Sequence, residues 1–109
     1  MVAEDDISVE IVDPRTLMPY DAETILESVR KTGRLLVVDE GFRFCGYGSE
    51  IISMVVENEM DSLRQPPRQL TPLHSTIPFS PPLERAALPD QARITAAIRR
   101  VLEDAPAAV

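Results

Sequence analysis

Cys45 and His74 are the side chains best suited to covalent or acid–base chemistry, and each stands alone in the sequence. A thiol near a helix N-terminus and Arg43 would gain reactivity, because positive potential favours the thiolate. Cys45 nevertheless has no second cysteine or nearby histidine, so its surroundings favour an inert small side chain. His74 has neither the neighbouring ligands of a metal site nor a nucleophile to activate. The sequence therefore predicts no catalytic residue and no metal ligand in this chain.

Three glycines lie between Gly41 and Ser49, just ahead of an expected helix. Free N–H groups at a helix N-terminus can bind an anion, and Arg43 would add positive charge. The spacing matches neither a P-loop nor a dinucleotide fingerprint. We therefore expect these glycines to serve helix entry and close packing, with anion binding as the weaker alternative, and we predict no cofactor-binding residue.

Charged residues near the turn between Pro14 and Pro19 allow two interpretations. Arg15, Asp21 and Glu40 could form an ion-pair network that fixes the turn and, through it, a subunit contact. The alternative is a solvated turn in which Asp21 only caps the following helix. Because exposed ion pairs contribute about 0–1 kcal/mol, the second interpretation is favoured. Arg15 and Asp21 are expected to be structural residues of the turn.

Acidic residues crowd the C-terminal half of the second expected helix, at Glu57, Glu59 and Asp61. Carboxylates there oppose the helix dipole by about 0.3–1 kcal/mol each, so helix stability does not explain them. A basic partner surface would explain them, whereas a solvated polar face is the more ordinary alternative.

Four of the five aromatic residues fall in expected loops rather than in core strands. They are Phe42, Phe44, Tyr47 and Phe79. Aromatic side chains outside a core often anchor protein interfaces. Together with the proline-rich residues 66–82 they form the best candidate for an apolar contact with a partner.

Hydrophobic spacing predicts three strands that alternate with three helices. Strands are expected at residues 7–12, 35–38 and 68–71, and helices at 22–32, 49–63 and 91–103. Asp21 and Asp90 stand at N-cap positions, and Gly33 is a natural helix stop. The expected buried stripes are Ile25, Leu26 and Val29; then Ile52, Val55, Val56, Met60 and Leu63; then Ile94, Ala97, Ile98, Val101 and Leu102. Alternation of this kind predicts an α/β fold, a three-layer αβα domain with a mostly parallel sheet.

Composition limits the chain to one domain and excludes several kinds of partner. The domain is expected at residues 7–104, between a flexible N-terminus at 1–6 and a tail at 105–109. The net charge of −7 disfavours nucleic acid and anionic membranes, since binding to either needs a surplus of Lys and Arg. No apolar run approaches the roughly 20 residues of a membrane span. A single cysteine fits a reducing compartment, so we expect a protein of the bacterial cytoplasm.

Three blocks of sequence resemble one family. They are VEIVDPRTLMPYDAETILESVRKTGRLLVVDE at residues 9–40, GYGSEI at 46–51 and IPFSPPLERAALPD at 77–90. The chain resembles the C-terminal domain of the transketolase-like β subunits of 2-oxo acid dehydrogenases, which act on pyruvate or branched-chain substrates. The resemblance implies thiamine diphosphate and Mg²⁺ in a parent enzyme, with neither bound by this chain. It also implies partners: an α subunit, a second β subunit, and the basic subunit-binding domain of the acyltransferase core.

The resemblance further implies that the family's first strands and first helix are missing here. In the family, a parallel strand lies between the strands expected here at residues 7–12 and 35–38. Unpaired backbone groups would then favour direct pairing of those two strands, strand exchange in a dimer, or a partner that fills the gap. Self-association is therefore expected. The function implied is subunit association without catalysis, with docking to the acyltransferase core as a second role. A stand-alone interaction module and a small anion-binding regulator are the alternatives.

Overall fold

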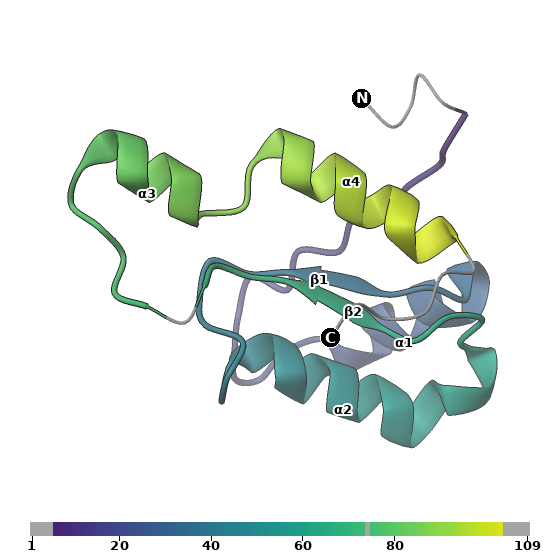
Figure 1. Cartoon of the computed structure of the whole chain (residues 1–109). Coiled ribbons are helices and arrows are strands. Elements are labelled where there is room, and N and C mark those ends of the chain that lie inside the picture. Colours follow the sequence, from purple (N-terminus) through teal and green to yellow (C-terminus); the bar gives the residue numbers. More distant parts are fainter. Residues whose placement is uncertain (1–5, 74, 104–109) are drawn as a thin grey trace.

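The structure describes residues 6–73 and 75–103. These residues fold around a two-stranded parallel sheet with helices on both of its faces (Figure 1). The structure is a computed structural model. Its elements in chain order are α1 (Ala22–Thr32), β1 (Leu36–Val38), α2 (Tyr47–Glu59), a short 3-10 turn (Met60–Ser62), β2 (Arg68–Leu70), α3 (Pro81–Ala87) and α4 (Gln91–Leu102). The expectations for residues 1–5, His74 and the tail at 105–109 lie outside the described residues.

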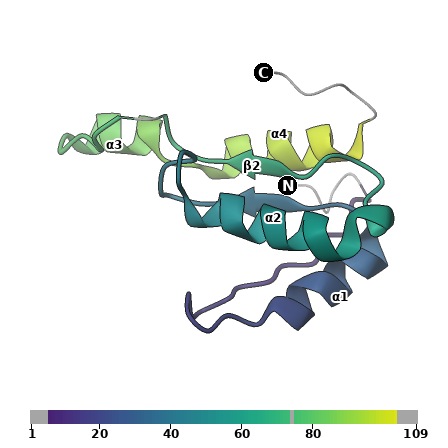
Figure 2. The same cartoon turned by 90° about the horizontal axis from the view of Figure 1, so that it is seen from below.

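The predicted α/β layering is confirmed. In β1 and β2, Leu36 lies opposite Arg68 and Val38 opposite Leu70. The N–H of Arg68 donates to the carbonyl of Leu35 at 3.0 Å, and the N–H of Asp39 donates to the carbonyl of Leu70 at 3.1 Å. Helix α4 covers one face of this sheet, whereas α2 lies on the other face with α1 beside it (Figures 1 and 2).

Helix α1 forms over the predicted residues because strong local signals mark both of its ends. Asp21 accepts hydrogen bonds from the backbone N–H and the hydroxyl of Thr24, at 3.1 and 2.6 Å. Gly33 ends the helix in the left-handed conformation, with a φ of 69°, and its N–H donates to the carbonyl of Val29 at 2.7 Å. A Cβ atom at this position would meet the Arg64 side chain at 2.9 Å. Both predicted caps are therefore confirmed.

The main core joins one face of α1 to one face of α2. Its buried members are Ile25, Leu26, Val29, Ile51 and Val55. Val29 and Val55 are the most completely buried large side chains, and the predicted stripe of α1 is confirmed. On the opposite face of the sheet, α4 buries Val101, whereas Leu102 is 40 % exposed.

The predicted stripe of α2 is partly wrong. The helix begins at Tyr47 rather than at residue 49, and it buries Gly48, Ile51 and Val55. Met60, which the prediction placed on the buried face, is 60 % exposed because the α-helix ends at Glu59. The buried face is turned toward both α1 and the sheet, which explains the small residue at position 48. A Cβ atom there would lie 2.8 Å from Oε1 of Gln69 in β2.

The predicted strand at residues 7–12 does not form in the described structure. This segment belongs to no ladder, because the sheet contains only β1 and β2. Strand formation requires a neighbour that shares backbone hydrogen bonds, and no strand of the described residues forms such bonds with this segment. The segment is held instead by side chains: Glu10 accepts from the Ser28 hydroxyl at 2.8 Å and from the Lys31 ammonium at 3.4 Å.

Helix α3 lies inside the proline-rich connection, where no helix was predicted. Its sequence starts with Pro81 and Pro82, which occupy the first turn, where a missing N–H costs nothing. Ser80 stands at the N-cap and Glu84 follows in the first turn. Serine followed by two prolines could have indicated this helix start from the sequence, although Ser80 makes no side-chain capping bond.

None of the helices in the described residues is long and apolar enough to cross a membrane.

Replacing Asp21 with asparagine should reduce the dependence of stability on pH. Hydrogen bonds from the Thr24 hydroxyl and N–H lower the pKa of Asp21. A carboxyl group whose pKa is lower in the folded state stabilises the fold above its unfolded pKa, near 3.9, and this contribution is lost as the pH falls through the folded pKa. Asparagine also caps helices well but does not titrate. Thermal unfolding at pH 5, 4 and 3 should therefore show a smaller fall in Tm for D21N than for the wild type.

The variant T24V provides the comparison, since it removes one donor and leaves the carboxylate in place. Its pH dependence should lie between those of the wild type and D21N. Identical falls in Tm for all three proteins would contradict the role assigned to Asp21.

Candidate functional site

Three connections lie at the same edge of the domain. They follow the segment at residues 7–12, strand β1 and strand β2. These connections comprise residues 13–20, residues 39–46 and the stretch that begins at residue 71, on the left in Figure 1. The carboxyl edge of a parallel sheet is where α/β domains usually place functional groups. A functional site is therefore expected at this edge.

Tyr47 ties the first of these connections to the start of α2. Its hydroxyl donates to the carbonyl of Leu17 at 2.8 Å. Its ring meets that of Tyr20 edge to face, with centroids 5.7 Å apart and an interplanar angle of 80°. Burial is the main cause of a raised pKa at Tyr47. Both tyrosines pack against the core, so the turn at residues 13–20 has a fixed position.

The connections at this edge carry large apolar side chains that are exposed. Phe79 is completely exposed and Met18 is 85 % exposed. We call the following five residues the carboxyl-edge surface: Leu17, Met18, Phe44, Leu73 and Phe79. Exposed apolar side chains on the connections at one edge are more typical of protein contacts than of catalysis.

The predicted aromatic contact is only partly reflected in this surface. Phe44 and Phe79 are exposed, as a contact residue must be, whereas Phe42 and Tyr47 are half-buried. Sequence reasoning missed Leu17 and Met18, although two apolar residues beside Pro19 in a turn could have indicated them. That any of these residues binds a partner stays a prediction.

The alternative network of Arg15, Asp21 and Glu40 is not formed in the described structure, in agreement with the favoured interpretation of a turn capped by Asp21. Arg15 instead pairs with Asp13, whose carboxylate lies 3.2 Å from the guanidinium Nε. Asp13 also accepts from the Arg15 N–H at 3.2 Å. Asp21 is occupied by Thr24, and Glu40 is exposed. Helix capping satisfies Asp21 locally, which explains why it takes no part in a longer-range pair.

The three acids at the end of α2 have different surroundings. Glu59 accepts from the Ser62 hydroxyl at 2.7 Å and from the Arg30 guanidinium, which also pairs with Glu23 at 2.7 Å. The Ser62 hydroxyl, followed by Arg30, lowers the pKa of Glu59. This group therefore links α1 to α2, which accounts for an acid at the helix end. Glu57 accepts only from Ser53 of its own helix, at 3.3 Å, among the bonds of the described residues, and Asp61 is exposed.

The glycine-containing loop makes hydrogen bonds within itself. The Gly46 N–H donates to the carbonyl of Arg43 at 3.1 Å, and the Ser49 hydroxyl donates to the same carbonyl, also at 3.1 Å. The Ser49 N–H donates to the carbonyl of Gly46 at 3.2 Å. Two of the N–H groups that an anion would need are thus already used. Cys45 is exposed and has a φ of 52°, which belongs to the tight turn before α2.

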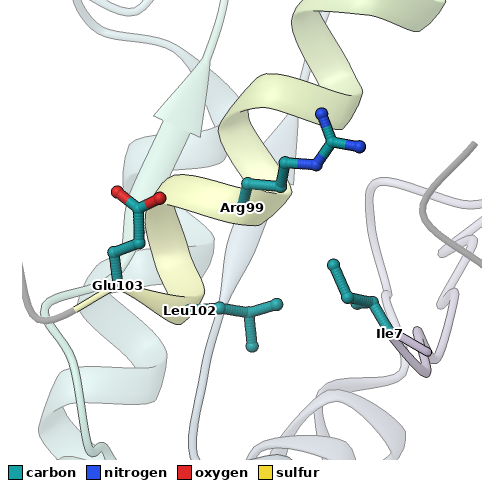
Figure 3. Close-up of a pocket in the computed structure, with 4 residues that line it drawn as sticks. All are labelled: Ile7, Arg99, Leu102 and Glu103. Carbon is teal, nitrogen blue, oxygen red and sulfur yellow. The ribbon is translucent and has the colours of Figure 1, made fainter. Parts of the chain in front are cut away.

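The described residues do not fit a thiamine diphosphate and magnesium site. Within residues 6–73 and 75–103, no group of three or more His, Cys, Asp and Glu side chains could hold a metal ion. A shallow depression of about 340 Å³ is lined by Ile7, Arg99, Leu102 and Glu103 (Figure 3). A diphosphate with Mg²⁺ needs several converging donors and oxygen ligands. One arginine beside one glutamate does not supply them.

Comparison with known proteins agrees with the architecture. The family described as transketolase, C-terminal domain, matches residues 1–94. The chain is 41 % identical over 102 residues to the β subunit of acetoin:2,6-dichlorophenolindophenol oxidoreductase from Cupriavidus necator, covering 94 % of the chain and 30 % of that subunit. It is 38 % identical over 101 residues to the pyruvate dehydrogenase E1 component subunit beta of Rickettsia felis, covering 93 % and 31 %.

A third relative is the 2-oxoisovalerate dehydrogenase subunit beta of Pseudomonas aeruginosa. It is 40 % identical over 100 residues, which cover 92 % of the chain and 28 % of that subunit. The chain thus spans less than a third of the length of each of these three relatives.

Proposed function

The chain belongs to the transketolase C-terminal domain family, and from this membership we propose that it is the non-catalytic C-terminal domain of a 2-oxo acid dehydrogenase β subunit. Relatives whose names carry pyruvate, 2-oxoisovalerate and acetoin activities support this proposal. Their similar identities, between 38 and 41 %, do not favour one substrate over another.

The role that we propose for this domain is subunit association. The observation that carries the proposal is the carboxyl-edge surface, five exposed apolar side chains on the connections at one edge of the sheet. An α subunit and a second β subunit of a parent enzyme are the proposed partners. Thiamine diphosphate and Mg²⁺ would then be bound elsewhere in that enzyme, since the described residues offer them no site. Location in the bacterial cytoplasm stays a prediction.

Docking to the subunit-binding domain of an acyltransferase core is a second proposed role. A basic surface would meet Glu57 and Asp61, because Glu59 is occupied by Arg30 and Ser62. The same surfaces would also serve a stand-alone interaction module, which is the alternative function. Within the described residues the loop uses the N–H groups of Gly46 and Ser49 internally, so we do not propose the small anion-binding regulator.

Replacing Leu17 and Phe79 together with serine should weaken association. We expect the wild-type chain to self-associate in solution, with a mass above its monomer mass of 12.1 kDa. Each substitution removes an exposed apolar side chain and therefore apolar area that association would bury, at about 25 cal/mol per Å². Sedimentation equilibrium should show a dissociation constant at least about tenfold larger for the double variant, since 1.4 kcal/mol corresponds to a factor of ten.

The control is Met60→Ser, which removes an exposed apolar side chain at the opposite end of α2 from the three connections. This variant should associate like the wild type. A wild-type chain that stays monomeric at several hundred micromolar, or an M60S variant that dissociates as readily as the double variant, would contradict the proposed role of the carboxyl-edge surface in self-association.

A further inference from the structure

Helix α3 projects from the domain. Figures 1 and 2 show it beyond the carboxyl end of the sheet, next to the start of α4. No helix or strand in the described residues packs extensively against it, and it buries none of its own residues. Phe79, just before the helix, is completely exposed, and Leu83 within it is 58 % exposed. We call residues 79–88 the arm, because they add nothing to the core.

So short a helix needs local support. Isolated helices of fewer than about 12–15 residues are marginal in water, and α3 has seven residues. Pro81 and Pro82 support its first turn. At the other end Pro89 has no N–H, so it cannot donate to the carbonyl of Arg85 four residues earlier. The last carbonyls of α3 therefore need a donor from elsewhere.

Arg93 supplies that donor. Its guanidinium donates through Nη2 to the carbonyl of Ala86, and through Nη1 to that of Leu88 at 3.2 Å. Its positive charge also suits the negative end of the helix dipole. The backbone of Arg93 is fixed in the first turn of α4, where its N–H donates to Asp90 at 2.8 Å. Arg93 thus ties the arm to a helix that packs on the sheet.

We propose that Arg93 is a positioning residue for association: it keeps the arm ordered and projecting, so that Phe79 and Leu83 meet a second copy of the chain. Phe79 belongs to the carboxyl-edge surface, and the arm extends that surface by Leu83. The inference rests on the proposed function and adds the residue that sets the position of the contact. An ordered contact segment strengthens association, because less conformational entropy is lost on binding.

A second copy is the partner that the charges of the arm allow. Residues 75–89 contain one acid and one base, Glu84 and Arg85, whereas the whole chain has a net charge of −7. Two acidic chains repel each other, and they approach at the least electrostatic cost through a neutral segment. A basic partner would instead favour an acidic segment, which the arm does not offer.

Sedimentation equilibrium of the full chain tests the proposal. Arg93→Gln shortens the side chain and removes its charge, so it should lose both bonds to the arm and raise the dissociation constant at least about fivefold. Arg93→Lys keeps the charge but not the planar fork of donors, and its dissociation constant should lie between those of R93Q and the wild type. Arg100→Gln removes the same charge from the last turn of α4, away from the arm, and should associate like the wild type.

Amide exchange and urea unfolding separate positioning from general support of the fold. In R93Q the N–H of Leu88, which donates to the carbonyl of Glu84, should exchange faster than in the wild type. The core amides of Val29 and Val55 should exchange at unchanged rates. The midpoint of urea unfolding, measured where the chain is monomeric, should also be unchanged, because α3 buries no residue.

A double-mutant cycle shows whether Arg93 acts through the arm. Leu83→Ser should weaken association in the wild type, since it removes apolar surface from the contact. In the R93Q background the same substitution should have a smaller effect, because Leu83 contributes only when the arm is ordered.

A monomeric wild-type chain would overturn both this inference and the proposed function. If the wild type associates and the double substitution of Leu17 and Phe79 weakens it, three results would overturn this inference alone. The first is an R93Q variant that associates as tightly as R100Q. The second is loss of protection at the core amides in R93Q, because Arg93 would then support the whole fold. The third is that the effects of R93Q and L83S multiply fully in the double variant.

Discussion

Replacing Val55 with aspartate should unfold the domain. Val55 has no exposed surface, and its side chain lies between α1 and α2 in the main core. A carboxylate there would lose its hydration without a cation or donor to replace it, and mutations that bury an unpaired charge cost about 4 kcal/mol or more. A domain of this size is stable by about 5–15 kcal/mol, and transfer of an unpaired carboxylate into an apolar interior costs more than the lower end of that range. Circular dichroism at 25 °C should therefore show loss of helix signal, or a midpoint of urea unfolding near zero.

The variant Val55→Ala measures how much the packing of the Val55 side chain alone contributes to the free energy of unfolding. That variant should stay folded and lose about 2 kcal/mol, from two deleted carbon groups and a small cavity. Ser53→Asp supplies the matched control for the charge, because Ser53 lies on the exposed face of the same helix. S53D loses the bond to Glu57 and sets two carboxylates four residues apart, so it should lower the free energy of unfolding by up to about 1 kcal/mol. A V55D protein as stable as S53D would contradict the burial of Val55.

The elements that the sequence predicts correctly are those whose signals are local. Helices α1 and α4 begin where Asp21 and Asp90 accept a backbone N–H from residues three positions later, at 3.1 and 2.8 Å. Gly33 ends α1 because its φ of 69° suits glycine. Such signals act within one helical turn, so no knowledge of the rest of the fold is needed to interpret them.

The failures occur where structure depends on partners far along the chain. Residues 7–12 alternate like a strand, yet they form none in the described structure because no neighbour shares their hydrogen bonds. In α2 the apolar residues surround more than half of the helix, so spacing could not decide which of them face α1. Ile51 is buried and Met60 is exposed, against the prediction.

The sequence predicted a contact surface built from aromatic residues in loops, but it did not predict which of those residues are exposed. Aromatic residues in loops indicated a contact surface, and Phe44 and Phe79 are indeed exposed. Tyr47 was included for the same reason, but its ring packs on Tyr20 and its hydroxyl bonds to Leu17. An aromatic residue in a loop can pack against the core or contact a partner. Only its distance from a core residue distinguishes these two roles. Leu17 escaped notice because a single leucine in a turn has no periodicity.

Replacing Gly46 with alanine should destabilise the domain more than the same substitution at Gly41, the other glycine of the connection at residues 39–46. A Cβ atom at this position would lie 2.1 Å from the carbonyl oxygen of Phe42 and 3.2 Å from that of Arg43. Both are backbone atoms, so no side-chain rotation relieves the overlap and the turn before α2 must open. Opening it breaks the bond from the Gly46 N–H to Arg43 and disturbs the start of α2. The expected loss is about 1–3 kcal/mol in urea unfolding, toward the upper end because the clash is with backbone.

Gly41→Ala is the control that separates this steric effect from the general stiffening of the chain by alanine. The nearest atom to a Cβ at Gly41 is a carboxylate oxygen of Asp39, at 3.3 Å, and that side chain is free to adjust. The bond from the Gly41 N–H to Asp39, 2.8 Å long, survives the substitution. G41A should therefore stay within about 0.5 kcal/mol of the wild type. Equal losses for the two variants would show that the close approach of Gly46 to Phe42 does not determine how α2 begins, whereas a large loss at Gly46 alone makes that contact the reason for glycine at this position.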